Sequence, residues 1–199
     1  MKTTPKAAIV AAVAAIALLT AACAGDNGRM ASSEPRTAGN PMVGGAPMYP
    51  SRTIVENAVN SKDHETLVAA VKAAGLVDTL QSDGPFTVFA PTDAAFAKLP
   101  DGTVQSLLRP ENKAQLTKIL TCHVVSANAL SDAINQMIVD DNGAHPVTTV
   151  GGCVYTAKRM GDDIVLVDGQ GNTARVTIAD VRQSNGVIHV IDSVLLPAA

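Results

Sequence analysis

Apolar residues recur along this chain at two spacings, and the change of spacing indicates the class of fold. Between residues 54 and 80 they recur every three or four positions, which is typical of amphipathic helices. After Gly143 they form short runs separated by turn residues, which predict strands at 147–150, 153–158, 164–167, 174–181 and 187–196. Helices followed by strands predict an α+β fold, and the lack of an internal repeat in the sequence indicates a single domain.

The middle of the chain gives a mixed pattern. Short apolar stripes predict helices at 104–108 and 112–120, and a β-rich run predicts a strand at 121–125. Residues 129–138 fit either one more helix or an irregular segment. The predicted fold therefore alternates helix and strand before it becomes wholly β.

Residues 85–100 contain all three phenylalanines of the protein and predict a strand followed directly by a helix. Positions 86–90 alternate as a short, largely buried strand does, and Pro91 ends it. Thr92 is suited to cap the following helix, and Asp93 is favourable near the positive end of the helix dipole. Because this stretch holds no nucleophile, metal cluster or phosphate loop, we expect it to build the core.

The first 50 residues predict export. Residues 1–22 have a positive start and a short apolar run, the layout of a signal peptide. The Thr-Ala-Ala-Cys sequence that ends at Cys23 resembles a bacterial lipobox, which would place a lipid on Cys23. The alternative is ordinary cleavage near Ala24. Residues 23–50 are rich in Gly, Ser, Pro and Asn and predict a disordered tether. The folded domain is expected at 51–199.

The predicted location follows from these signals. Ala24 after the cysteine favours the outer membrane, by resemblance to enterobacterial sorting. We therefore expect an outer-membrane-anchored lipoprotein, or a periplasmic or secreted protein. The net charge of −3 leaves no basic footprint, so nucleic acid is not an expected partner. With aromatic residues at only 3%, the core must rest on Val, Ile, Leu and Ala.

Two long motifs, at 86–99 and 185–197, together resemble the signatures of the fasciclin-type domain. The resemblance covers roughly 52–197 and implies a wedge-shaped β-sandwich with helices packed on one side. It also implies adhesion as a function class. The residues that carry the resemblance, read as structural, are Phe86, Thr87, Phe89, Ala90, Pro91, Thr92, Asp93, Phe96, His123, Asn185, Gly186, His189 and Asp192.

The chain departs from the family at the segments associated with adhesion in eukaryotic members. A Tyr-His pair of the family is replaced here by Cys122-His123. The family's Asn-Lys-Asp-Ile segment falls on 178–181, where Asp180 is retained and Val181 is a near match. These two residues form the candidate adhesion segment, and integrin-type recognition is not carried over.

Cys122 and Cys153 are predicted to lie in strands of an exported protein, where disulfides persist. If the two strands are neighbours, a bridge closing about 30 residues would stabilise by roughly 3–4 kcal/mol. Two small buried thiols are the alternative. The choice depends on whether the Cα atoms approach within about 7 Å.

The histidines and acidic residues do not predict chemistry. His123 and His189 fall in apolar strands, where we expect them to be buried and hydrogen-bonded. A metal site that combines them with an aspartate lacks a recognisable ligand spacing. His64 and His145 are expected at exposed loop or helix-edge positions. No catalytic motif stands out, so we expect no enzyme, metal or cofactor.

Two functions remain open from the sequence. The first is a non-enzymatic surface or periplasmic adhesion module, whose partner is a protein or polysaccharide of the cell envelope or extracellular matrix, with a lipid anchor holding it to the membrane. The second is a carrier of an apolar ligand such as a lipid or carotenoid, with the helices between residues 54 and 80 lining a groove. These helices can equally well only pack the core.

Overall fold

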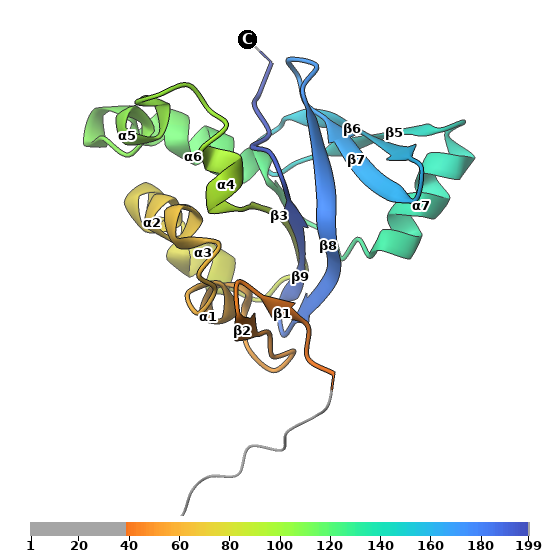
Figure 1. Cartoon of the computed structure of the whole chain (residues 1–199), viewed down its shortest axis with the longest axis horizontal. Coiled ribbons are helices and arrows are strands. Elements are labelled where there is room, and N and C mark those ends of the chain that lie inside the picture. Colours follow the sequence, from red (N-terminus) through yellow and green to blue (C-terminus); the bar gives the residue numbers. More distant parts are fainter. Residues whose placement is uncertain (1–38, 199) are drawn as a thin grey trace, which may run out of the picture. The chain divides into compact units, whose positions relative to one another are not determined.

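The computed structural model describes residues 39–198, which form an α+β domain (Figure 1). Its elements follow one another as β1 (Met42–Val43), β2 (Ala46–Pro47), α1 (Ile54–Ala58), α2 (Glu65–Ala74), α3 (Val77–Gln81), β3 (Phe86–Pro91), α4 (Asp93–Phe96), α5 (Thr103–Leu107), a 3₁₀ turn (Pro110–Asn112), α6 (Lys113–Cys122), β4 (Val124–Val125), α7 (Ser131–Asp140), β5 (Ala144–Thr148), β6 (Val154–Met160), β7 (Asp163–Val167), β8 (Thr173–Gln183) and β9 (Gly186–Ile191).

Seven strands form one mixed sheet in the order β4-β3-β9-β8-β7-β6-β5. Only β3 and β9 run parallel, paired from Phe86 opposite Gly186 to Pro91 opposite Ile191. The two signature segments, about a hundred residues apart in sequence, are therefore neighbours in the sheet. Their start is very close, because a Cβ added at Gly186 would lie 2.0 Å from the carbonyl oxygen of Phe86. Only glycine fits this position.

The long strand β8 joins the two halves of the sheet. Its first residues pair with β7 and the rest with β9, with register shifts between Val176 and Val181. Such bulges bend a strand and increase its twist. The bend turns β5–β7 toward the other face of β3 and β9, which gives the wedge shape expected of the sandwich.

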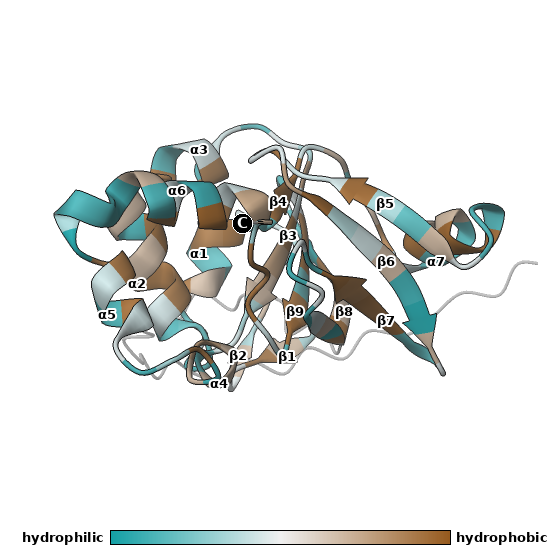
Figure 2. Ribbon diagram, turned by 90° about the horizontal axis from the view of Figure 1, so that it is seen from above, coloured by the Kyte–Doolittle hydropathy of each residue, from teal (hydrophilic) through white to brown (hydrophobic). Residues whose placement is uncertain are grey.

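The domain holds two apolar clusters, one on each face of β3 and β9. The first lies against α1–α6 and includes Val88 and Ala90 of β3. The second lies between the halves of the sheet and includes Phe89 together with Tyr155. Figure 2 shows the apolar colour concentrated on these central strands and on the helix faces beside them. Phe89 therefore packs sheet against sheet, whereas Phe96 packs helix against sheet.

Most of the predicted elements are present, including the strand-to-helix transition at 86–96 and the helical reading of 129–138. The strand predicted at 121–125 is wrong. Helix α6 continues through Cys122, and β4 contains only two residues. The reason is tertiary, because Leu116, Ile119 and Leu120 form one buried helical face that overrides the β preference of the residues that follow. Unlike the other helices, α7 packs against β5 and β6.

The folded domain begins before residue 51, the start predicted from the sequence. The hairpin β1–β2 buries Val43 and Met48, whose side chains are 4% and 2% exposed. Both main-chain groups of Tyr49 bond the buried Asn57 amide, at 3.0 and 2.8 Å. The tether prediction is therefore corrected for residues 40–50. The predicted signal peptide and Cys23 lie outside the described residues. Within residues 39–198 we find no helix with the length and apolar character needed to cross a membrane.

Candidate functional site

Asn185 of the second signature acts as a clamp between the sheet and two helices. Its carboxamide oxygen accepts the main-chain N–H of Ile54 at 3.0 Å. Its amide nitrogen donates to the carbonyl oxygens of Leu80 at 2.8 Å and Ser82 at 3.0 Å. Asn185 is only 8% exposed, so these three bonds join the start of α1 and the end of α3 to the β8–β9 turn. Both polar atoms of the Asn185 side chain are therefore hydrogen-bonded within the fold.

The two polar residues that follow β3 cap two different helices. Thr92 accepts the N–H of Ala95 at 3.2 Å and caps α4, as the sequence predicts. The Asp93 carboxylate instead accepts the N–H groups of Thr66 at 2.8 Å and Glu65 at 3.2 Å, the start of α2. Its negative charge therefore stabilises the end of a neighbouring helix.

His123 and His189 are buried and fully hydrogen-bonded, as expected, although His123 is the C-cap of α6 and does not lie in a strand. His123 donates from Nδ1 to the carbonyl of Ile119 at 2.8 Å and accepts the N–H of Leu195 at Nε2, at 3.0 Å. This assigns the neutral ring with its proton on Nδ1. Burial lowers the pKa of His123 to about 4.

His189 takes the opposite tautomer. Its Nε2 donates to the carbonyl of Ala129 at 2.8 Å, and its Nδ1 accepts the N–H of Asp180 at 3.3 Å. Burial lowers the pKa of this imidazole as well. With both ring nitrogens of both histidines engaged, neither ring has a lone pair to offer a metal. Among residues 39–198 no group of three His, Cys, Asp or Glu side chains could hold a metal ion.

The prediction of an exposed His64 is wrong. This side chain is 3% exposed, contacts the Ser61 hydroxyl at 2.8 Å through Nδ1 and lines a small recess together with Val43 of β1. Burial lowers its pKa. The cause lies in the hairpin, whose Gly44 lies against residues 61–63. His145 is half-buried and pairs with Asp141 at 2.6 Å.

These buried histidines predict that the domain loses stability in acid. The unfolded chain gains protons on histidine near pH 6.5, whereas folded His123 resists protonation until about pH 4. The contribution of the buried histidines to the free energy of unfolding should therefore be fully present above pH 6.5. It should fall as the pH drops toward 4, by about 3 kcal/mol from His123 alone. Urea unfolding of wild type and His123→Gln at pH 7.5 and 4.5 measures this difference. A wild-type loss no larger than that of the variant would contradict the assignment.

The candidate adhesion segment has structural roles. The Asp180 carboxylate accepts the N–H of Ser131 at 2.7 Å and also bonds the Ser131 hydroxyl, at the start of α7. Val181 is 1% exposed and belongs to the first core. Asp192 likewise accepts the N–H of Arg175 at 2.9 Å. Val181 is therefore buried and the Asp180 carboxylate is engaged with Ser131, while the adhesive role expected of these two residues stays a prediction.

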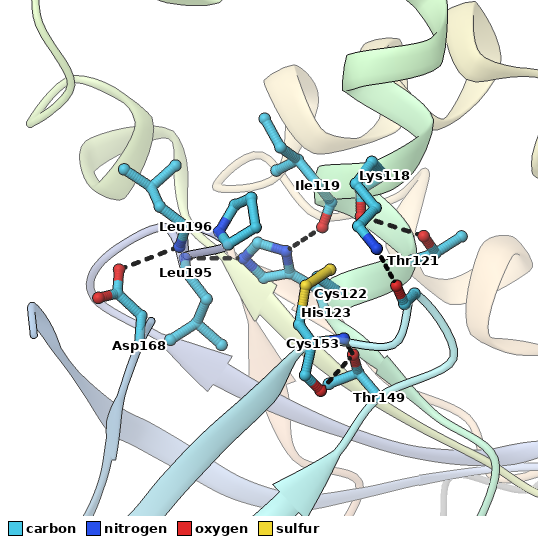
Figure 3. The surroundings of a disulfide bond; sticks show 12 residues. Lys118, Ile119, Thr121, Cys122, His123, Thr149, Cys153, Asp168, Leu195 and Leu196 are labelled. Atoms are coloured by element: carbon cyan, nitrogen blue, oxygen red, sulfur yellow. Dashed lines mark hydrogen bonds between the residues drawn. A yellow bond between two sulfur atoms is a disulfide. The ribbon is translucent and has the colours of Figure 1, made fainter. Parts of the chain in front are cut away.

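Cys122 and Cys153 form a disulfide, with Cα atoms 5.4 Å apart at a sequence separation of 31 (Figure 3). The bridge is confirmed but its predicted position in two strands is wrong. Cys122 ends α6 and Cys153 directly precedes β6. It therefore fastens the helical part to the far half of the sheet. Main-chain bonds reinforce the junction, from Gly151 to Thr121 at 2.9 Å and from Val150 to Val124 at 2.7 Å.

Asp168, which no sequence motif singles out, forms a second polar clamp. This carboxylate is 6% exposed and accepts main-chain N–H groups of Gln170 at 2.9 Å, Asn172 at 2.8 Å and Leu196 at 3.0 Å. Figure 3 shows it beside the final segment of the chain, next to the Leu195 bond of His123. Its only sequence signal is the Asp-Gly turn between two β-runs.

An apolar recess lies between α1–α3 on one side and β3, β4 and α6 on the other. Its cavity volume is about 50 Å³, and the space that includes the open solvent at its mouth is about 590 Å³. The lining comprises Ile54, Val55, Ala58, Leu67, Val68, Val71, Lys72, Leu76, Val77, Leu80, Val88, Phe89, Leu120, His123 and Val124. The helices between residues 54 and 80 therefore pack the first apolar cluster and also line a small recess.

Comparison with known proteins agrees with this geometry. Residues 62–197 match the model of the Fasciclin domain. Protein sll1483 of Synechocystis sp. is 51% identical over 145 residues, which cover 73% of each chain. Cell surface glycolipoprotein MPB83 of Mycobacterium bovis is 34% identical over 147 residues, covering 71% of this chain and 59% of its own.

Among solved structures, the FAS1 domain pair from the insect cell adhesion molecule Fasciclin I aligns with a TM-score of 0.52 and 26% identity. The match covers 66% of this chain and 44% of that one. Together with the family match over residues 62–197, it establishes the fold and the relationship. The chain belongs to the fasciclin domain family.

Proposed function

We propose that this protein is an exported, non-enzymatic adhesion and interaction module of the cell envelope, held to the membrane by a lipid on Cys23. Its family relationship to cell-surface and adhesion-associated proteins supports this proposal. The disulfide is consistent with export. The partner would be a protein or polysaccharide of the envelope or extracellular matrix.

Exposed apolar side chains near β6 indicate where on the surface a partner would bind. Half of the six exposed large apolar side chains among the described residues fall between positions 150 and 160. Val150, Val154 and Met160 are 50%, 56% and 55% exposed. Val154 and Met160 lie on β6 an even number of residues apart, so they share the sheet face opposite the buried Tyr155. Exposed apolar side chains at both ends of one strand face make this face a candidate contact surface.

Replacing Val154 and Met160 together with glutamate should reduce attachment at least tenfold without lowering stability, because both side chains are on the surface. Attachment of a gene-deletion strain, complemented with wild type or the double variant, measures the effect. Val139→Glu is the matched control, since Val139 is 63% exposed on α7. Full attachment by the deletion strain would refute the adhesive function, and full attachment by the double variant would refute this surface.

A second function, carriage of an apolar ligand, is favoured by the recess between α1–α3 and β3. A lining of branched aliphatic side chains that opens at the surface is the usual character of a small-ligand site. Protein purified from its native host should then yield a bound lipid or carotenoid in an organic extract. An extract without such a molecule would argue against carriage and would leave the adhesive proposal intact.

A further inference from the structure

The recess between α1–α3 and β3 has polar chemistry at one place only. Thirteen of its fifteen lining residues are apolar, and the other two are Lys72 and His123. His123 cannot serve a ligand, because both ring nitrogens are already bonded within the protein. Lys72 is therefore the single group in the lining that could meet the polar end of a bound molecule.

The recess is apolar at its base and has a charged residue near its mouth. Val88, Leu120 and Val124 are buried at its base, whereas Val55 and Val68 are half-buried nearer the surface. Lys72 is exposed in the last turn of α2. Within residues 39–198 no ion pair to Lys72 is found. A ligand that matches this arrangement is apolar along its length and negatively charged at one end.

A second ammonium group lies at the same end of α2. The Nζ of Lys113 lies 3.4 Å from the position that a Cβ at Gly75 would take, and Gly75 is the C-cap of α2. No acidic residue lines the recess. Lys72 is therefore the one ammonium group in the lining, and it complements a carboxylate.

We propose that the recess binds a free fatty acid, with its single acyl chain among the aliphatic side chains and its carboxylate at Lys72. This inference rests on the second proposed function and names its ligand class. Because the cavity is only about 50 Å³, a ligand can enter only if side chains at the mouth move apart. A single unbranched acyl chain requires the smallest such movement. A ring-ended carotenoid or a two-chain phospholipid is wider. A polyene with polar groups at both ends would also leave one of them in the apolar base.

Isothermal titration of the purified protein with decanoic acid and with 1-decanol tests the proposal at neutral pH. The wild type should bind the acid more tightly than the alcohol. Lys72→Gln should weaken binding of the acid about five- to tenfold, the effect of one partly exposed charge, and leave binding of the alcohol unchanged. Lys158→Gln, at an exposed position on β6, is the matched control and should bind both ligands like wild type.

A variant that fills the recess tests whether the acyl chain binds there. Ala58→Leu places three further carbon atoms in the lining and should abolish binding of both ligands, with circular dichroism to verify folding. Equal affinities for acid and alcohol, or no effect of Lys72→Gln on the acid, would overturn the fatty-acid inference while leaving carriage of apolar molecules intact. Binding of neither ligand by the folded wild type would overturn both.

Discussion

Replacing Cys153 with alanine is expected to lower the free energy of unfolding by about 3–4 kcal/mol. The disulfide closes a loop of 31 residues, and releasing it restores conformational entropy to the unfolded chain by this amount in the loop-closure model. The native state also loses its covalent link between α6 and the loop before β6. Urea unfolding without reductant measures the difference.

The controls for this prediction are Cys122→Ala and the double variant. Cys122→Ala, Cys153→Ala and the double variant should be destabilised by similar amounts, because each removes the same bond. Reduced wild type should approach the same value. The sequence contains three cysteines, so the denatured, unreduced protein should show no reactive thiol beyond Cys23. Reactive thiols at Cys122 and Cys153, or a single variant as stable as wild type, would show that the bridge is absent.

Replacing Asn185 with alanine should cost about 3–4 kcal/mol. The substitution leaves the N–H of Ile54 and the carbonyls of Leu80 and Ser82 without their side-chain partner. Each buried polar group left unbonded costs about 1–3 kcal/mol, less where water can reach it. Thermal and urea unfolding measure the loss.

Asn128 offers a matched control, since it is an exposed asparagine near the same turn and forms no hydrogen bond recorded for the described residues. Asn128→Ala should change stability by less than about 0.5 kcal/mol. Equal effects of the two substitutions would mean that Asn185 does not clamp the helices to the sheet.

Local chemistry explains what could be predicted from the sequence. The alternation at 86–90, the end of the strand at Pro91 and the cap at Thr92 are all written within a few residues of one another. The α+β class followed from two spacings of apolar residues, and the two signatures named the family. Each of these inferences needs only near neighbours in the chain.

What could not be predicted depends on residues far apart in the sequence. Asp93 has the right charge for its own helix, yet it caps α2, whose start lies 27 and 28 residues earlier. His64 looks exposed until the hairpin at 42–47 covers it, and that hairpin has the composition of a tether. Cys122 follows a β-rich local pattern but ends a helix whose buried face determines its structure.

The candidate site shows the same division. The signature polar residues Thr92, His123 and His189 bond backbone groups of the fold, which supports the structural role predicted for them. The adhesion segment could not be judged from sequence, since the burial of Val181 and the bonds of Asp180 arise only when β8 bends toward α7. Likewise, the recess needs three helices and the sheet to be placed together before Lys72 is found at its rim.

The central proposal is that the signature residues maintain the fold and that an exposed surface on β6 binds the partner. Envelope binding by Asn185→Ala protein, measured at a low temperature where circular dichroism shows it fully folded, tests this claim most directly. The account predicts that the variant binds isolated envelopes with the wild-type Kd although it unfolds more easily, whereas Val154→Glu/Met160→Glu protein loses binding at unchanged stability. Loss of envelope binding by the folded Asn185→Ala variant would contradict the claim, because it would place the signature turn itself in the binding site.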